Sequence, residues 1–221
     1  MLDRCVPALK EILKQIELKD HITEMDYGFQ IGPIINASSR LYDDGRCKSS
    51  TGYGNGDKDF RLPWKVKFVV DNNTKRKIIM KENIKKVNES LALRGVEKPI
   101  VVYNPEIGEG IIGLIAGRLC EEHHCPVIVF TDCEDGLLKG SGRSIPEIHL
   151  KDVLDKIQDK IVGYGGHAGA AGLTIRRDEL ESFQVAFHEA CGKIPELPED
   201  TVYDLELLGT DIAEALEELK K

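Results

Sequence analysis

Small side chains dominate the segment of this sequence best suited to contact an anion. Glycines and alanines fill most of the positions of Gly163-Tyr-Gly-Gly-His-Ala-Gly-Ala-Ala-Gly172, so a ligand or another stretch of backbone can come close to the main chain. Exposed N–H groups in such a turn form an anion-binding nest, and His167 can donate a hydrogen bond to a phosphate oxygen. Gly165, Gly166 and His167 are therefore candidate phosphate-binding residues. The alternative is a tight turn that only allows close packing.

A second segment, Lys139-Gly-Ser-Gly-Arg-Ser144, carries hydrogen-bond donors at an expected strand end. Ser141, Arg143 and Ser144 supply hydroxyl and guanidinium donors that suit phosphate. Alone, the segment is equally compatible with a hairpin-like turn that carries a surface arginine.

A third segment, Gly32-Pro-Ile-Ile-Asn-Ala-Ser-Ser-Arg40, predicts a turn that enters a helix at the proline. Asn36 and Arg40 are four residues apart, so they share one side of that helix. The alternative is a helix cap with an arginine that faces solvent.

Charge is unevenly distributed along the 221 residues, whose formal net charge of −8 argues against indiscriminate nucleic-acid binding. Residues 61–98 hold eleven Lys or Arg against four Asp or Glu, whereas residues 196–221 hold two against nine. A basic surface that faces a polyanion would explain this asymmetry, and so would a solvated helix face. The scattered cysteines predict free thiols in the cytoplasm, and no apolar run is long enough to cross a membrane.

Periodicity predicts the elements that must position these segments. Residues 2–18 have the apolar spacing of a core-facing helix. Residues 64–70 alternate like a strand, residues 74–93 have few helix breakers, and Trp64 is expected to be a buried anchor. Further strands are expected at 100–103, 127–130, 137–144 and 173–175, and helices at 111–122, 150–161 and 178–191, with a loop at 163–172. Such alternation predicts an α/β domain with helices layered on a sheet.

Taken together, the three segments resemble the RecJ exonuclease branch of the DHH phosphoesterase superfamily. Gly165 to Gly172 is similar to the GGH-x-x-A-A-G signature of the DHH-associated substrate-binding domain, and Gly32 to Arg40 to the G-P-x-x-N-A-x-x-R segment that closes the RecJ catalytic domain. Further similar segments are Gly108 to Arg118, Pro126 to Phe130, Gly140 to Ser144 and Asn73 to Arg76. No single piece is specific, but their joint occurrence in this order is.

The resemblance implies a 5′→3′ exonuclease on single-stranded DNA that uses Mn²⁺ or Mg²⁺ and acts in DNA repair and recombination. It further implies that Asn36, Arg40, Ser141, Arg143, Ser144, Gly165, Gly166 and His167 grip the phosphates of the strand. The family's aspartate and histidine metal ligands have no counterpart here, because the sequence contains no Asp-His-His triplet and no Asp-x-Asp strand near its start. We therefore expect no catalytic and no metal-binding residues in this chain, which should be inactive alone.

The same resemblance predicts a fragment in four parts, with Met1 as a fragment boundary. Residues 1–60 would be the end of a DHH catalytic domain, 61–95 a connecting basic helix, 96–194 the DHH-associated domain with a mixed sheet, and 195–221 a truncated lead-in to an OB-fold domain. We expect a monomer whose partner is single-stranded DNA. Two alternatives stay open: a DHH phosphodiesterase that acts on oligoribonucleotides or cyclic dinucleotides, and a non-catalytic nucleic-acid-binding module.

Overall fold

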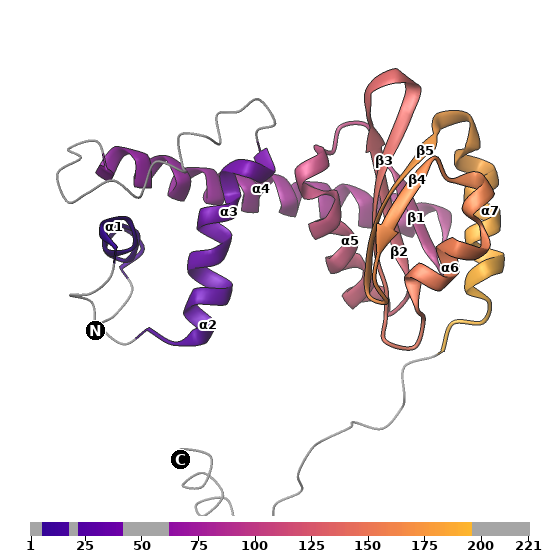
Figure 1. Cartoon of the computed structure of the whole chain (residues 1–221), viewed down its shortest axis with the longest axis horizontal. Coiled ribbons are helices and arrows are strands. Elements are labelled where there is room, and N and C mark those ends of the chain that lie inside the picture. The colour runs from indigo at the N-terminus through magenta and orange to yellow at the C-terminus, as the bar shows by residue number, and fades with distance from the viewer. Residues whose placement is uncertain (1–5, 18–21, 42–61, 196–221) are drawn as a thin grey trace, which may run out of the picture.

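The computed structural model describes residues 6–17, 22–41 and 62–195. These residues form a small helical part and a sheet domain, which the long helix α4 connects (Figure 1). The glycine-rich segment at 43–59 and the acidic segment at 196–221 lie outside the described residues. Among the helices that the structure describes, none is long and apolar enough to cross a membrane.

The helical part is held together by a small apolar core. Helix α1 (Pro7–Gln15) begins at a proline, which suits the first helical turn because its missing N–H has no partner there. Ile12 of this helix packs with Ile34, Val66 and Val69, and all four side chains are buried. The expected core-facing helix near the start of the chain is therefore present over its described residues.

The predicted turn before Asn36 is wrong, because the chain is already helical there. Helix α2 (Glu24–Asp26), the π-helical turn η2 (Tyr27–Ile31) and helix α3 (Gly32–Leu41) follow one another without interruption. Thr23 and Asp26 cap the start with reciprocal hydrogen bonds. Pro33 lacks an N–H and would crowd the carbonyl four residues before it, and the wide π turn just ahead of it accommodates this conflict.

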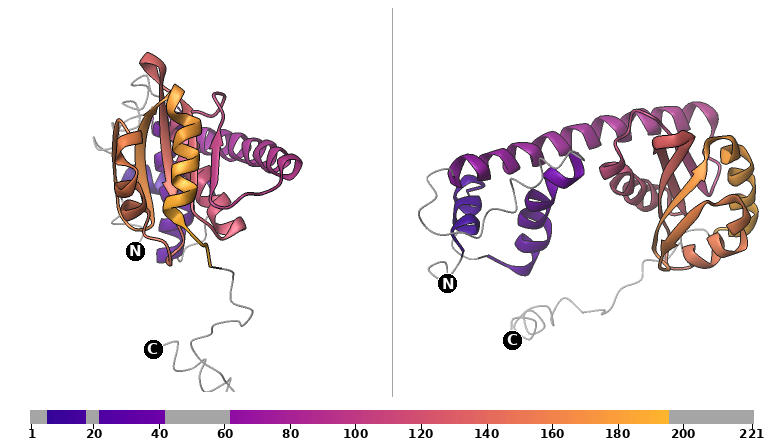
Figure 2. Two further views of the ribbon diagram at one scale, coloured as in Figure 1. Left: turned by 90° about the vertical axis from the view of Figure 1, so that its right-hand side faces the viewer. Right: turned by 45° about the horizontal axis from the view of Figure 1, so that its top comes forward.

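Helix α4 spans Leu62–Arg94, so the strand expected at 64–70 is wrong. Val66, Val69 and Asn73 are buried at helical spacing against the helical part, and this packing outweighs the short alternation in the sequence. Trp64 is 76% exposed and is not the buried anchor that we expected. The right-hand view of Figure 2 shows α4 running along the molecule from the helical part to the sheet domain.

The sheet domain contains five strands in the order β1-β2-β3-β5-β4. They are β1 (Ile100–Tyr103), β2 (Val127–Asp132), β3 (Leu137–Arg143), β4 (Gly163–Gly166) and β5 (Ala170–Arg176). Strands β1 and β2 are parallel and are connected by helix α5 (Glu109–His123), whereas the other pairs are antiparallel. The predicted α/β fold, a mixed sheet flanked by helices, is confirmed.

Helices cover the two faces of the sheet unequally. Helix α5 packs on β2 and β3 on one face. On the other face lie α6 (Leu150–Lys156) and α7 (Leu180–Cys191), as Figure 1 shows. Phe183 of α7 packs edge-to-face against Phe130 of β2 in the hydrophobic core between α7 and the sheet. Short 3₁₀ turns at Glu134–Gly136, Gln158–Lys160 and Arg177–Glu179 connect these elements.

The loop expected at 163–172 is wrong, because the segment is a β-hairpin. Gly163–Gly166 forms strand β4, which pairs with β5, and β5 begins at Ala170. Glycine-rich sequences have low strand propensity, but pairing to the central strands fixes this one. On the same side as α5, none of the described helices covers β5 and β4 (Figure 1).

Candidate functional site

A hollow of about 580 Å³ lies where helices α3 and α5 meet strand β3. Its lining combines arginine, lysine, hydroxyl and amide groups with several glycines. The lining residues are Asn36, Ser39, Arg40, Glu109, Gly110, Ile112, Gly113, Lys139, Gly140, Ser141, Arg143 and Gly172. The hollow therefore brings together the second and third segments that the sequence singled out.

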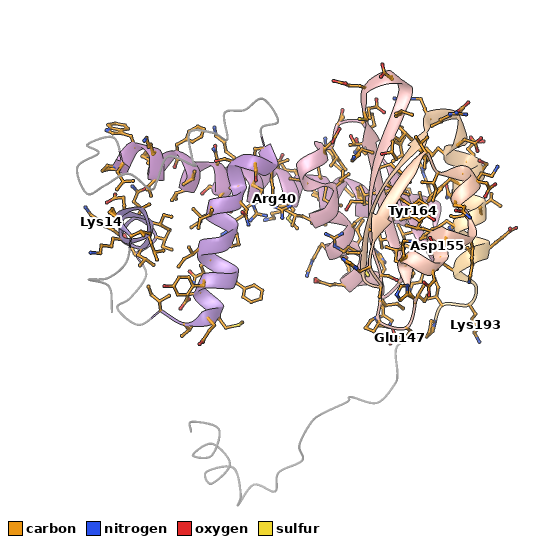
Figure 3. All side chains as sticks on the ribbon, in the orientation of Figure 1. Lys14, Arg40, Glu147, Asp155, Tyr164 and Lys193 are labelled. Atoms are coloured by element: carbon orange, nitrogen blue, oxygen red, sulfur yellow. The ribbon has the colours of Figure 1, made fainter. Side chains whose placement is uncertain are left out.

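Arg40 reaches this hollow from the last turn of α3, at the junction of the helical part and the sheet domain (Figure 3). Its Nη1 donates a hydrogen bond to the carbonyl oxygen of Gly110 on α5, at 3.2 Å. A Cβ at Gly110 would lie 2.1 Å from the carbonyl oxygen of Arg40, so glycine is needed for α3 to approach α5 this closely. The contact fixes Arg40 relative to the sheet.

Arg143 and Ser141 enter the hollow from β3. Nη1 of Arg143 donates to the carbonyl oxygen of Gly142 at 2.8 Å and lies 3.4 Å from Oγ of Ser141. Gly113 of α5 faces them, and a Cβ there would lie 2.8 Å from Oγ of Ser141 and 3.2 Å from Nη2 of Arg143. The glycines of α5 thus leave the room that the two side chains occupy.

A third arginine lies near Arg40 but does not line the hollow. Arg76 of α4 is 9% exposed and donates from Nε and Nη2 to Oδ1 of Asn73, at 3.2 and 3.0 Å. Burial lowers the pKa of Arg76, and the positive charge of Arg40 lowers it further. The pKa of Arg143 is lowered in the same way, by burial first and then by Arg40.

The charges of these three arginines are not compensated by ion pairs with acids in the part of the chain that the structure describes. Within the described ranges, no carboxylate forms an ion pair with Arg40, Arg76 or Arg143. Repulsion among partly buried guanidinium groups is unfavourable, and a bound anion relieves it. The cluster suits phosphate, because each guanidinium group is positively charged and presents donors that match phosphate geometry.

The strand register extends this site across the sheet. Ser141 pairs with Gly172, which pairs in turn with Gly165, so the three lie in one row across β3, β5 and β4. In the next row Arg143 pairs with Ala170. The backbone N–H of His167 donates to the carbonyl oxygen of Ala170 at 2.8 Å, so His167 continues this row.

The turn of the hairpin is anchored by backbone hydrogen bonds. The carbonyl oxygens of Ala168 and Gly169 accept from the N–H groups of Leu150 and Ser144, at 2.8 and 3.0 Å. Gly166 has φ +159°, and a Cβ there would lie 2.3 Å from the carbonyl oxygen of Ala170. Gly166 therefore has a structural role in the turn, while Gly165 and Gly172 have open space where a side chain would be.

The predicted site residues divide into two groups. Asn36, Arg40, Ser141 and Arg143 line the hollow together. Gly165, Gly166 and His167 lie on the neighbouring hairpin, where His167 is exposed and does not line the hollow. Ser144 lies outside it too, and its hydroxyl donates to the carbonyl oxygen of Ile148 at 2.7 Å.

Sequence reasoning did not select several residues that line the hollow. Lys139 precedes the selected serine and arginine by two and four positions, which on a strand places all three on one face. Alternation along β3 could therefore have identified it. Glu109 and Gly110 have no signal of their own, because their role depends on the contact between α3 and α5.

The described residues do not provide a metal centre. Within the parts of the chain that the structure describes, no three His, Cys, Asp or Glu side chains come together as metal ligands would. Glu109 is the acidic residue that lines the hollow, and hard divalent cations need several oxygen ligands. The described residues therefore do not fit a divalent metal, and the absence of ligands from the whole chain stays a prediction.

Comparison with known proteins agrees with this arrangement. Residues 97–193 match the model of the DHHA1 domain. The single-stranded-DNA-specific exonuclease RecJ of Salmonella typhimurium is 32% identical over 201 residues, which cover 84% of this chain and 33% of that protein. RecJ of Haemophilus influenzae is 34% identical over 178 residues, covering 77% of this chain and 31% of that protein. The chain thus spans about a third of the length of these relatives.

Solved structures show the same fold. The crystal structure of RecJ from Thermus thermophilus with Mg²⁺ superposes on 96% of this chain with a TM-score of 0.78 at 23% identity, and this chain covers 33% of it. The structure of the same protein with Mn²⁺ gives a TM-score of 0.79. From the domain match, the relatives and the shared fold, we conclude that this chain belongs to the RecJ-like proteins of the DHH superfamily and that residues 97–193 are its DHHA1 domain.

Proposed function

We propose that this chain is the strand-binding part of a RecJ-like exonuclease and that its hollow binds the phosphates of single-stranded DNA. The observation that carries the proposal is that Arg40 and Arg143 line the hollow together and form no ion pair with a carboxylate among the described residues. Guanidinium groups held together in this way gain most from a ligand with closely spaced negative charges.

Each predicted contact residue has a distinct part in this proposal. Arg40 and Arg143 approach the phosphate from opposite walls, α3 and β3, and Ser141 and Asn36 donate neutral hydrogen bonds. Gly165 leaves the strand room beside them, Gly166 allows the turn to form, and His167 can donate to a neighbouring phosphate. Ser144 acts indirectly, because its backbone N–H holds the turn that carries His167, while its hydroxyl donates to Ile148.

The proposal includes a division of labour between this chain and a metal-bearing lobe. The described residues do not assemble a metal site, whereas the matched RecJ structures contain Mg²⁺ or Mn²⁺. We propose that residues 1–60 complete that lobe, that 61–95 connect it to the binding domain at 96–194, and that 195–221 lead into a further domain. The same proposal includes what the resemblance implies about the whole enzyme: 5′→3′ polarity, a monomeric state and a role in DNA repair and recombination. It also includes a cytoplasmic location, which agrees with the free thiols of the described cysteines.

A binding and cleavage assay with the purified chain tests the proposal. We expect a labelled oligothymidylate to bind with an affinity that falls steeply between about 50 and 200 mM salt, because bound phosphates release counterions. We expect no shortening of the oligonucleotide with Mn²⁺ or Mg²⁺. Degradation that survives repurification would contradict the division of labour, and failure to bind at low salt would contradict the binding role. An oligoribonucleotide competitor that displaces the DNA at lower concentration would favour the phosphodiesterase alternative.

A further inference from the structure

A second hollow of about 420 Å³ continues the first across the uncovered part of the sheet. Its lining residues are Lys139, Val162, Gly163, Tyr164, Gly172, Leu173 and Thr174. Lys139 and Gly172 line both hollows, so the two are adjacent parts of one groove.

Hydrogen-bond donors follow one another at regular spacing along one side of the groove. Arg143, Ser141 and Lys139 alternate with buried residues along β3, so all three point to the face of the sheet on which α5 lies. Successive members are two residues apart on an extended strand, about 7 Å. This spacing is comparable with that of successive phosphates along a nucleic-acid strand. Thr174 pairs with Lys139 across β3 and β5 and adds a hydroxyl to the same row.

The floor of the groove is backbone. Gly163, Gly165 and Gly172 have no atom within 4 Å of the position that a Cβ would take. A ribose or base can therefore lie directly against the sheet between the donors of β3 and the hairpin. The floor lies on the face of β5 and β4 opposite to that covered by α6 and α7, as the burial alternation of β5 indicates.

The charges that line neighbouring hollows indicate how far along the sheet the groove can contact a nucleic-acid strand. Lys139 forms no ion pair within the described residues. Beyond Thr174, a third hollow is lined by Lys160 and Arg176 together with Asp159 and Glu179. Lys160 lies 3.7 Å from Glu179, so its charge is already compensated. The lining of this third hollow is therefore balanced in charge, whereas that of the second hollow carries Lys139 and no acid.

We propose that the groove has two phosphate subsites, the first at Arg40, Arg143 and Ser141 and the second at Lys139 and Thr174. This inference rests on the proposed function and adds to it a second point of contact, which a ligand of at least two nucleotides can reach and a mononucleotide cannot. With the second subsite, a ligand that carries two phosphates binds more tightly than a ligand that carries one. This subsite favours an oligonucleotide over the mononucleotide that hydrolysis of a strand would release.

Calorimetric titration with thymidine 5′-monophosphate and with the 5′-phosphorylated dinucleotide pdTpdT tests the second subsite. We expect the unmodified chain to bind pdTpdT more tightly. Lys139→Gln should lower the ratio of the two affinities about five-fold, because it removes one cation from the second phosphate. Lys160→Gln is the matched control, since its ammonium is paired with acids in the neighbouring hollow, and it should leave the ratio unchanged.

A dinucleotide with a neutral methylphosphonate linkage makes the test specific. The wild-type preference for pdTpdT over this analogue should disappear in Lys139→Gln, because the two changes remove the same interaction. Gly163→Val should lower the affinity ratio too, because its side chain would enter the second hollow in a strand that accepts valine.

The outcomes separate the two proposals. Equal losses for mononucleotide and dinucleotide in Lys139→Gln, or no loss in either, would overturn the second subsite while the first remained. If the unmodified chain bound neither ligand nor a longer oligothymidylate, the proposed function itself would fall and the subsite with it.

Discussion

Arg143 is expected to contribute strongly to binding, because it is half-buried and forms no ion pair with a carboxylate among the described residues. Replacing it by glutamine should weaken binding of an oligothymidylate by about 2 kcal/mol, or roughly thirty-fold in Kd. Fluorescence anisotropy measures this directly. Arg118→Gln is the control, since Arg118 is a solvent-exposed arginine that pairs with Glu121 on α5. Equal losses in both variants would indicate a general effect of charge and contradict a specific phosphate site.

Glu109 opposes the proposed ligand, because it is the carboxylate that lines the hollow beside three cationic side chains. Glu109→Gln should therefore tighten DNA binding, by about two- to three-fold at low salt and less at high salt, since Glu109 is exposed and its charge is screened. Glu121→Gln on the outer side of α5 provides the comparison. Weaker binding in Glu109→Gln would indicate that the DNA strand does not pass the side of the hollow that Glu109 lines.

Residue types in the sequence predicted much of the hollow but not all of it. Asn36, Arg40, Ser141 and Arg143 were found because each carries donors in a short, recognisable segment. Glu109 and Gly110 were not, since their place depends on the long-range contact between α3 and α5. Ser144 was selected for its hydroxyl, which the structure uses to bond Ile148 instead.

At the scale of elements, the glycines of the β4–β5 hairpin have two different roles. Gly166 has a structural role in the turn, whereas Gly165 belongs to the floor of the groove. Gly166→Ala should lower the free energy of unfolding by about 1–3 kcal/mol, because φ is positive and the new Cβ would clash with Ala170. Gly165→Ala has open space and should change stability little, yet it should weaken oligonucleotide binding. Urea unfolding with parallel anisotropy distinguishes the two, and the opposite pattern would refute this assignment.

The contact between α3 and α5 makes a second prediction at this scale. Gly110→Ala would place a Cβ 2.1 Å from the carbonyl oxygen of Arg40, so α3 must move away from α5. We expect a loss of stability of about 1–3 kcal/mol together with weaker DNA binding, as Arg40 leaves the hollow. Gly108→Ala, whose Cβ would meet nothing within 4 Å, is the control and should do neither. Binding that survives in Gly110→Ala would show that Arg40 does not contribute to it.

Apolar patterning predicted most elements of the sheet domain, because β2 is largely a continuous apolar run and α5 carries its buried residues at helical spacing. It failed at residues 64–70, where seven residues were too few to distinguish alternation from a helix that packs Val66 and Val69. It failed at Gly163–Gly166 because that strand is held by pairing with β5, which propensity does not register.

At the scale of the whole molecule, α4 connects a helical part to a DHHA1 domain (Figure 2). As a result, Arg40 and Arg143 line one hollow from different elements. Neither part alone contains the site. Arg40 and Arg143 line the hollow from α3 and β3, and a groove extends from it across the open part of the sheet. The lining of the hollow holds three cationic side chains and one carboxylate, so positive charge is concentrated there although the whole chain is acidic, as the proposed binding of a polyanion requires.

A map of backbone amide chemical shifts during titration with an oligothymidylate tests this account most directly, because it locates the ligand on the whole chain. The account predicts that the largest changes cluster at Gly110, Ser141, Gly165 and Gly172, with little change in α6 and α7. Changes centred on α6 and α7, or spread evenly over the surface, would contradict it.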